Sequence, residues 1–287
     1  MVGSGFDGPE WAEPQNSNMF TWAPPAVAPV GGRYCTYSCT GKILHDLGVT
    51  KYAGLAYGIS PSSQEAITTT LVAAKRYGIT QCYLNDSVPY GSADFTADAL
   101  QIKTAGCNGV GSGMADAGVV ALGGAVKHAG IRAEQLNSTG YDENVLNDVA
   151  AASALDGTYF ESEINFTTPN AATQAMLDTM KKYDRGYKGG IPDYGPYTSY
   201  LATDLAIKGL QVAGKNPTRS TFITNLHQVS NYDAGGILPS PTTFEHFATA
   251  AMFPTTSCTY LVELQGNHFV VQNKNKSICG TRISFPA

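Results

Sequence analysis

Apolar and polar positions alternate in the middle of the chain with a regular rhythm of strand and helix. An apolar run over 52–57 is followed by a Gly-Ile-Ser-Pro-Ser-Ser turn and a helical pattern over 64–77. Pro61 suits the first turn of this helix, and Gly78 suits its end. Further strands are predicted at 80–84, 107–111, 131–136 and 158–162, with helices at 94–104, 115–128 and 143–151. Strands that alternate with helices of about ten to fifteen residues predict right-handed βαβ units and a parallel sheet.

The rhythm changes after Asn165. Helical patterns cover 170–183, 197–213 and 217–228, and strand-like runs at 258–264 and 268–272 flank a predicted hairpin turn at 265–267. Amphipathic helices need a partner layer, and a sheet is the usual one in α/β proteins. The sequence therefore predicts one doubly wound α/β lobe, followed by helices with few strands to pack on.

Composition narrows the classes of function. The 18 Lys+Arg and 23 Asp+Glu give a net charge of -5 and contain no basic block, so nucleic acid is not an expected partner. Only 14% of the residues are charged, and Gly (31) and Tyr (16) are abundant, which is more typical of an exported protein. No apolar stretch approaches the roughly 18 residues of a membrane span. The N-terminus lacks the features of a signal peptide, so either such a segment preceded it or the protein stays inside the cell.

The six cysteines permit three disulfides, and none has the paired spacing of a zinc site. One pair lies close in sequence, and another brackets the two strand-like runs near the C-terminus. We predict the disulfides Cys35–Cys39, Cys258–Cys279 and, by elimination, Cys82–Cys107. Six reduced thiols in a cytosolic core are the alternative.

Motifs of common enzyme classes are absent from the sequence. There is no GxSxG, HExxH or GxxxxGK[ST] motif. The glycine-rich run at 109–114 follows a predicted strand as a dinucleotide fingerprint would, but it ends in Met114, and no acidic residue ends a later strand at the expected distance. The five histidines are scattered, and Asp142 with Glu143 is typical of a helix start. We therefore expect no enzyme, no cofactor and no metal site.

Small polar side chains follow the predicted strands, where ligands bind in doubly wound sheets. Hydroxyl groups and helix N-termini there can donate hydrogen bonds to a polar or anionic small molecule. Each residue alone also fits an ordinary turn or cap, and a tyrosine-rich stretch over 187–200 offers a stacking wall. The candidate binding residues are Ser60, Ser62, Ser63, Ser112, Met114, Ser138, Thr139, Tyr141, Tyr194 and Tyr197.

Several stretches, taken in order, resemble one known family. They are 20–24 (Phe-Thr-Trp-Ala-Pro), 51–57, 93–95, 105–107, 129–131, 138–142, 155–160, 195–200 and 232–239. The chain resembles the substrate-binding proteins of bacterial ABC transporters of the leucine/isoleucine/valine-binding type. The resemblance implies the type I periplasmic binding fold, with two doubly wound parallel-sheet lobes that close on a small-molecule ligand by hinge bending. It also implies ABC permease subunits as partners, an extracytoplasmic location (periplasmic, secreted or anchored at the cell surface) and no catalysis.

The resemblance also places the lobes and exposes two departures. Residues 1–24 correspond to a remnant of the first lobe, 25–160 to the second, 161–250 to a return to the first, and 251–287 to a return to the second with a disulfide-linked hairpin. Family members normally carry further chain ahead of this sequence, so we expect an incomplete first lobe, with self-association or a complementing N-terminal segment as possible consequences. Thr139 stands where amino-acid binders commonly carry a carboxylate for the ligand ammonium, so a branched-chain amino acid is not favoured.

Two other classes of function stay open. One is a ligand-sensing regulatory module of the same fold. The other is an assembly protein, because an incomplete lobe would leave apolar faces that invite association. Oxidised cysteines would favour the exported binder over a cytosolic regulator.

Overall fold

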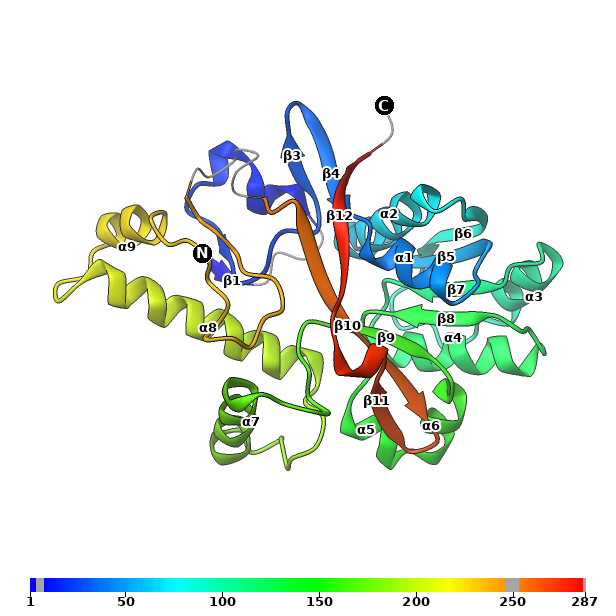
Figure 1. The fold of residues 1–287 in the computed structure, drawn as a ribbon. Helices are drawn as coiled ribbons and strands as arrows, with labels where there is room; N and C mark the ends of the chain where they lie inside the picture. Colours follow the sequence, from blue (N-terminus) through cyan, green and yellow to red (C-terminus); the bar gives the residue numbers. More distant parts are fainter. Residues whose placement is uncertain (4–7, 246–252, 286–287) are drawn as a thin grey trace.

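The computed structural model describes residues 1–3, 8–245 and 253–285, and a parallel sheet forms one half of the molecule (Figure 1). Its strands lie in the order β6 (Thr80–Val88), β5 (Lys51–Tyr57), β7 (Gly109–Ser112), β8 (Glu134–Asn137) and β9 (Tyr159–Ser162). All four neighbouring pairs are parallel. Numbered along the chain, the order is 2-1-3-4-5, one of the two common orders of doubly wound sheets. The predicted α/β class and βαβ units are confirmed.

Helices cover both faces of this parallel sheet. They are α1 (Cys39–Asp46), α2 (Pro61–Arg76), α3 (Thr96–Thr104), α4 (Asp116–His128), α5 (Glu143–Asn147) and α6 (Val149–Leu155). Side chains along β5 point alternately to the two faces of the sheet, and each face has its own core. On one face Tyr52 packs with Leu44 of α1 and Ala74 of α2. On the other face Leu55 packs with residues of α3 and α4, among them Ile102 of α3.

The helix predicted at 143–151 is in fact two helices. Asp148 adopts an extended backbone conformation between them, with φ -102° and ψ 106°. Its carboxylate accepts hydrogen bonds from the backbone N–H groups of Ala150 (2.8 Å) and Ala151 (3.1 Å) and thereby caps α6. The continuous helical pattern of the sequence is therefore divided at Asp148, because its side chain caps the start of a second helix.

Beyond β9 the sheet continues with antiparallel strands. They are β10 (Thr256–Gln265), β11 (His268–Val271), β12 (Ile278–Ser284), β4 (Arg33–Tyr37) and β3 (Ala28–Val30). The β10–β11 hairpin has the predicted turn, with Gly266 at φ +65°. The β3–β4 hairpin, β12 and α1 were not predicted.

Two of the predicted disulfides are present. Cys82 in β6 is joined to Cys107, which precedes β7, and Cys258 in β10 is joined to Cys279, directly opposite it in β12. The first links two crossover units of the parallel sheet, and the second links two neighbouring antiparallel strands.

The third predicted disulfide, Cys35–Cys39, is wrong, because both residues are free thiols. Cys35 lies within β4, and its sulfur lies 3.6 Å from the Ser284 hydroxyl of β12. Cys39 begins α1 after a turn at Ser38. Strand and helix geometry on either side of this turn sends the two side chains to different neighbours, which closeness in sequence does not reveal.

The other half of the molecule is mostly helical. It contains α7 (Ala171–Tyr183), α8 (Tyr194–Ala213) and α9 (Arg219–Leu226), on the other side of β10 and β12 in Figure 1. The small sheet here, in the described residues, pairs β1 (Val2–Gly3) with β2 (Phe20–Thr21). Phe20, Trp22 and Phe244 are buried in the core that these helices share. Aromatic side chains from β2 and from irregular segments therefore pack on the helices where a larger sheet is lacking among the described residues. The lobe boundaries given above stay a prediction.

No helix among the described residues is long and apolar enough to cross a membrane.

Close packing of α1 on α2 gives a first prediction. A Cβ added at Gly41 would lie 2.0 Å from the Ala73 carbonyl oxygen, so Gly41→Ala should lower the free energy of unfolding by about 1–3 kcal/mol through overpacking. At Gly124 in α4 the nearest atom is Ala154 Cβ at 3.8 Å, so Gly124→Ala should leave stability unchanged or raise it by up to about 1 kcal/mol. Urea unfolding of both variants tests this. Equal effects at the two positions would contradict the tight α1–α2 contact.

Candidate functional site

The order of β5 and β7 opens a crevice at their carboxyl ends. The chain leaves β5 through α2 toward β6, and it leaves β7 through α4 toward β8, so the two connections diverge. Ligands of open α/β sheets bind at such a switch point. A cavity of about 340 Å³ lies here, lined by the start of α2, the loops after β7 and β8, Tyr194 of α8 and the short 3-10 helix Pro9–Ala12. We refer to it as the switch-point cavity.

Most of the sequence-predicted residues meet at this cavity. Seven of the ten line it: Ser60, Ser62, Ser63, Met114, Ser138, Thr139 and Tyr194. They come from three strand ends and from α8, so segments far apart in the sequence converge here. The N-termini of α2, α4 and α8 also open toward it, because Ser62, Ala115 and Tyr194 at these helix starts are among its lining residues.

Hydrogen bonds already engage several of these hydroxyl groups. Ser63 Oγ accepts from the Tyr57 backbone N–H (2.8 Å) and donates to the Gly113 carbonyl, so it ties the end of β5 to the end of β7. Thr139 Oγ1 donates to the Met114 carbonyl at 2.6 Å. These two residues therefore hold the loops in place. Ser138 is exposed and its hydroxyl has no hydrogen bond in the described structure, so it is available to a ligand.

The other three predicted residues are buried away from the switch-point cavity. Ser112 lies within β7, and both its N–H and its hydroxyl bond Asn137 Oδ1 at 3.0 Å. Tyr141 and Tyr197 pack in the core with their hydroxyl oxygens 2.8 Å apart. Side chains just after a strand end can turn inward as easily as outward, and strand-end position alone does not distinguish these cases.

Sequence reasoning missed several lining residues. Tyr57 is the last residue of β5, so the same strand-end argument would have found it. Glu10 and Trp11 come from an irregular N-terminal segment that carries no periodic signal.

A second cavity, of about 190 Å³, adjoins the first and shares Ala66 and Ser138 with it. We refer to it as the β9 cavity, because Glu161 of β9 and Glu163 just beyond it line its wall. Burial, with a contribution from Glu163, raises the pKa of Glu161 to about 7 against a hydrogen bond from Thr40 that lowers it. Burial likewise raises the pKa of Glu163, while the hydrogen bond from Tyr197 lowers it. The free thiol of Cys39 also lines this cavity, and burial raises its pKa to about 12.

The family follows from comparison with known proteins. The family model described as periplasmic binding protein matches residues 2–268, which is most of the chain. This chain belongs to the periplasmic binding protein family. Comparison with curated proteins gave no match.

Solved structures agree with this fold. A solute-binding protein of an ABC transporter from R. palustris, in complex with benzoate, has a TM-score of 0.69 at 16% identity, covering 94% of this chain and 67% of that one. A branched-chain amino acid ABC transporter protein from Thermus thermophilus with bound valine has a TM-score of 0.68 at 16% identity, and the match covers 91% of this chain and 68% of that one. A substrate-binding protein of an ABC transporter from Aeropyrum pernix has a TM-score of 0.70 at 15% identity, and the match covers 96% of this chain and 70% of that one. This periplasmic binding protein thus spans about two thirds of the length of each neighbour.

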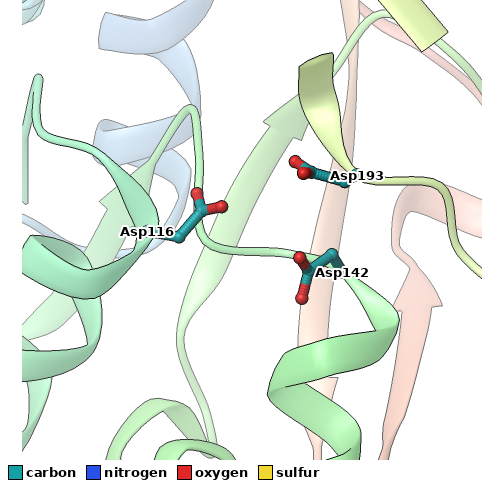
Figure 2. Close-up of side chains that lie close together, drawn as sticks. All are labelled: Asp116, Asp142 and Asp193. Atoms are coloured by element: carbon teal, nitrogen blue, oxygen red, sulfur yellow. The ribbon is translucent and has the colours of Figure 1, made fainter. Parts of the chain in front are cut away.

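Three carboxylates of this periplasmic binding protein meet near the helix starts (Figure 2). Asp116 of α4, Asp142 before α5 and Asp193 before α8 place carboxylate oxygens within 4.8 Å of one another. Asp116 accepts a hydrogen bond from the Gly140 N–H (2.7 Å), and Asp142 accepts one from Val145 (2.9 Å). Burial, and then the charge of Asp193, raise the pKa of Asp116. Burial, and then the charge of Asp142, raise that of Asp193.

These raised pKa values predict that repulsion destabilises the fold at neutral pH. A carboxyl whose folded pKa is raised loses stability as pH rises above its unfolded pKa and regains it when protonated. Asp193→Asn should therefore raise the free energy of unfolding at pH 7.5 by about 0.5 kcal/mol, the scale of a partly screened charge pair. The gain should vanish near pH 3.5, and urea unfolding at both pH values measures it.

Asp148→Asn provides the matched control, because Asp148 also caps a helix but is exposed and outside this cluster. Asn caps helices as well as Asp does. An equal gain in both variants, or a loss of stability in Asp193→Asn, would contradict repulsion within the cluster.

Proposed function

We propose that this chain is the solute-binding component of an ABC importer and captures a small organic molecule in the switch-point cavity without catalysis. The observation that carries the proposal is the convergence of seven independently predicted residues on one cavity at the β5/β7 switch point. Membership of the periplasmic binding protein family supports it, since hinge closure around a ligand is the general behaviour of such two-lobed folds.

The chemistry of the cavity favours a ligand with a polar or anionic end. Helix N-termini favour negative charge and offer backbone donors. Of the three that line the cavity, those of α4 and α8 already have Asp116 and Asp193 beside them, so the N-terminus of α2 is the one that can receive an anion. Ser138 adds a hydroxyl, while Tyr57, Trp11 and Met114 add apolar surface. Benzoate and valine, held by two of the structural neighbours, both combine a carboxylate with an apolar body.

An extracytoplasmic location and a permease partner belong to the same proposal. The structural neighbours described above are ABC transporter proteins. The disulfides Cys82–Cys107 and Cys258–Cys279 support an oxidising compartment, because disulfides persist outside the cytosol.

Ligand binding can be tested by thermal unfolding with a panel of amino acids, aliphatic carboxylates, aromatic carboxylates and amines. We expect at least one compound to raise the midpoint of unfolding, because a ligand that binds the folded state stabilises it by mass action. Native mass spectrometry of the purified protein should show the same compound bound one to one. No stabilisation by any compound and no co-purified small molecule would contradict the proposed function.

The site can be tested by filling the cavity. Ser138→Trp should weaken the active compound about tenfold or more, equivalent to about 1.4 kcal/mol, because Ser138 lines both cavities without a structural hydrogen bond. Ser153→Trp, at an exposed position of α6, is the matched control and should keep the affinity. Calorimetric titration measures both, and retained affinity in Ser138→Trp would place the ligand elsewhere.

A further inference from the structure

The two carboxylates of the β9 cavity have no basic partner. Among the described residues, the ion pairs join Asp46 to Lys42 and to His45, and none of these three residues lines this cavity. Both oxygens of Glu161 share the single hydroxyl hydrogen of Thr40, at 3.0 and 3.1 Å. Glu163 accepts from the Tyr197 hydroxyl at 2.6 Å. An ionised carboxylate has about four acceptor sites, so both groups retain unused acceptor capacity at the cavity wall.

A buried hydroxyl in the same wall is also without a partner. Tyr37 of β4 lines the β9 cavity, is 8% exposed, and its hydroxyl makes no hydrogen bond. Buried polar atoms in folded proteins nearly always have a partner, and one that lacks a partner needs an explanation. The hydroxyl without a partner and the two carboxylates are independent observations, and a ligand group that donates several hydrogen bonds would satisfy both.

We infer that the β9 cavity receives a primary ammonium group of the ligand and that Glu161 and Glu163 select for it. An ammonium has three donors and no acceptor, which matches two carboxylates and one hydroxyl oxygen. Its charge also compensates two half-buried anions that otherwise lack a basic partner, an arrangement that is costly where water is largely excluded. The inference rests on the proposed function and names the ligand class of the same site.

The two cavities adjoin each other, and this arrangement determines how far apart the charged groups of the ligand must be. Ala66 and Ser138 line both cavities and so lie where they meet. Asp116 and Asp193 already place carboxylates at the starts of α4 and α8, whereas the first turn of α2 carries none, so the α2 N-terminus is the one that favours a ligand carboxylate, and the β9 cavity favours an ammonium. A molecule that satisfies both must carry its charges at opposite ends of a chain, as an ω-amino acid does. In an α-amino acid the two charged groups are attached to one carbon and cannot occupy separate cavities.

Three compounds of five carbons test this in the unmodified protein. Calorimetric titration should show that 5-aminopentanoate binds at least about tenfold more tightly than pentanoate, which lacks the amine, and than 2-aminopentanoate, which has it beside the carboxylate. Equal affinity for pentanoate would overturn the ammonium site. Equal or tighter binding of 2-aminopentanoate would overturn the two-cavity assignment. Binding of other compounds of the panel would then still support a solute binder, whereas binding of none would remove both proposals.

Substitutions assign the selectivity to particular residues. Glu161→Gln and Glu163→Gln should each weaken 5-aminopentanoate about tenfold or more and leave pentanoate unchanged. Glu134→Gln is the matched control, because burial also raises the pKa of Glu134 on β8 but it lines neither cavity. Thermal unfolding without ligand checks the fold of each variant. Unchanged affinity for 5-aminopentanoate in both Gln variants would overturn the role of these carboxylates.

The affinity should also rise with pH. The groups that interact with Glu161 are Cys39 and Thr40 of α1, Tyr52 of β5 and Glu163. Tyr37 lines the same cavity, and the charge of Arg282 acts on Tyr37. Burial raises the pKa values of the Cys39 thiol and the Tyr52 hydroxyl far above neutrality, so Glu161, whose pKa is raised to about 7, is the group of this wall that changes charge near neutral pH. Binding is measured between about pH 5.5 and 8.5. Affinity for 5-aminopentanoate should increase several-fold over this range and flatten in Glu161→Gln. A flat profile in the unmodified protein would contradict ammonium binding at Glu161.

Discussion

The neighbouring placement of β5 and β7 is the constraint on which the candidate site depends. Because the chain leaves these strands in opposite directions, their loops separate and expose the N-termini of α2 and α4 at one place. Ser63 holds this opening in shape, since its buried hydroxyl joins the Tyr57 N–H to the Gly113 carbonyl. The residues around Ser63 line the cavity because the ends of β5 and β7 are joined in this way, and their position does not depend on their own side-chain chemistry.

Charge is distributed unevenly around the opening. Helix N-termini supply partial positive charge on the side of the switch-point cavity, while Glu161 and Glu163 lie unpaired at the adjoining cavity. Desolvation raises the pKa of both glutamates, which means that their surroundings in the protein disfavour the ionised forms. Stability that is lost by burying unpaired carboxylates is recovered when a cationic group binds, so binding and folding are linked through the same two residues.

Much of the parallel half could be predicted from the sequence, because its strands and helices carry strong periodicity and clear caps. Pro61 lies in the first turn of α2 as predicted, although the cap is Ser60 and the helix begins before the predicted pattern at 64–77. The predicted strand ends identified most of the loops that line the cavity. The inward direction of Tyr141 and Tyr197 depends on packing between segments that are distant in sequence, which local patterns do not encode. The β3–β4 hairpin was not predicted because its strands are short, and because β4 pairs with β12, which is distant in sequence. Glu161 and Glu163 were missed although they too end a strand, because charged residues in a strand suggest a solvent-exposed face.

The most direct test of the account is amide hydrogen exchange of the protein with and without the compound that stabilises it most. The account predicts slower exchange over 58–66, at the start of α2, and over 112–118, at the start of α4, with smaller changes on the outer faces of α8 and α9. Protection confined to α8 and α9, with none at the two loops after β5 and β7, would contradict a ligand site at the switch point.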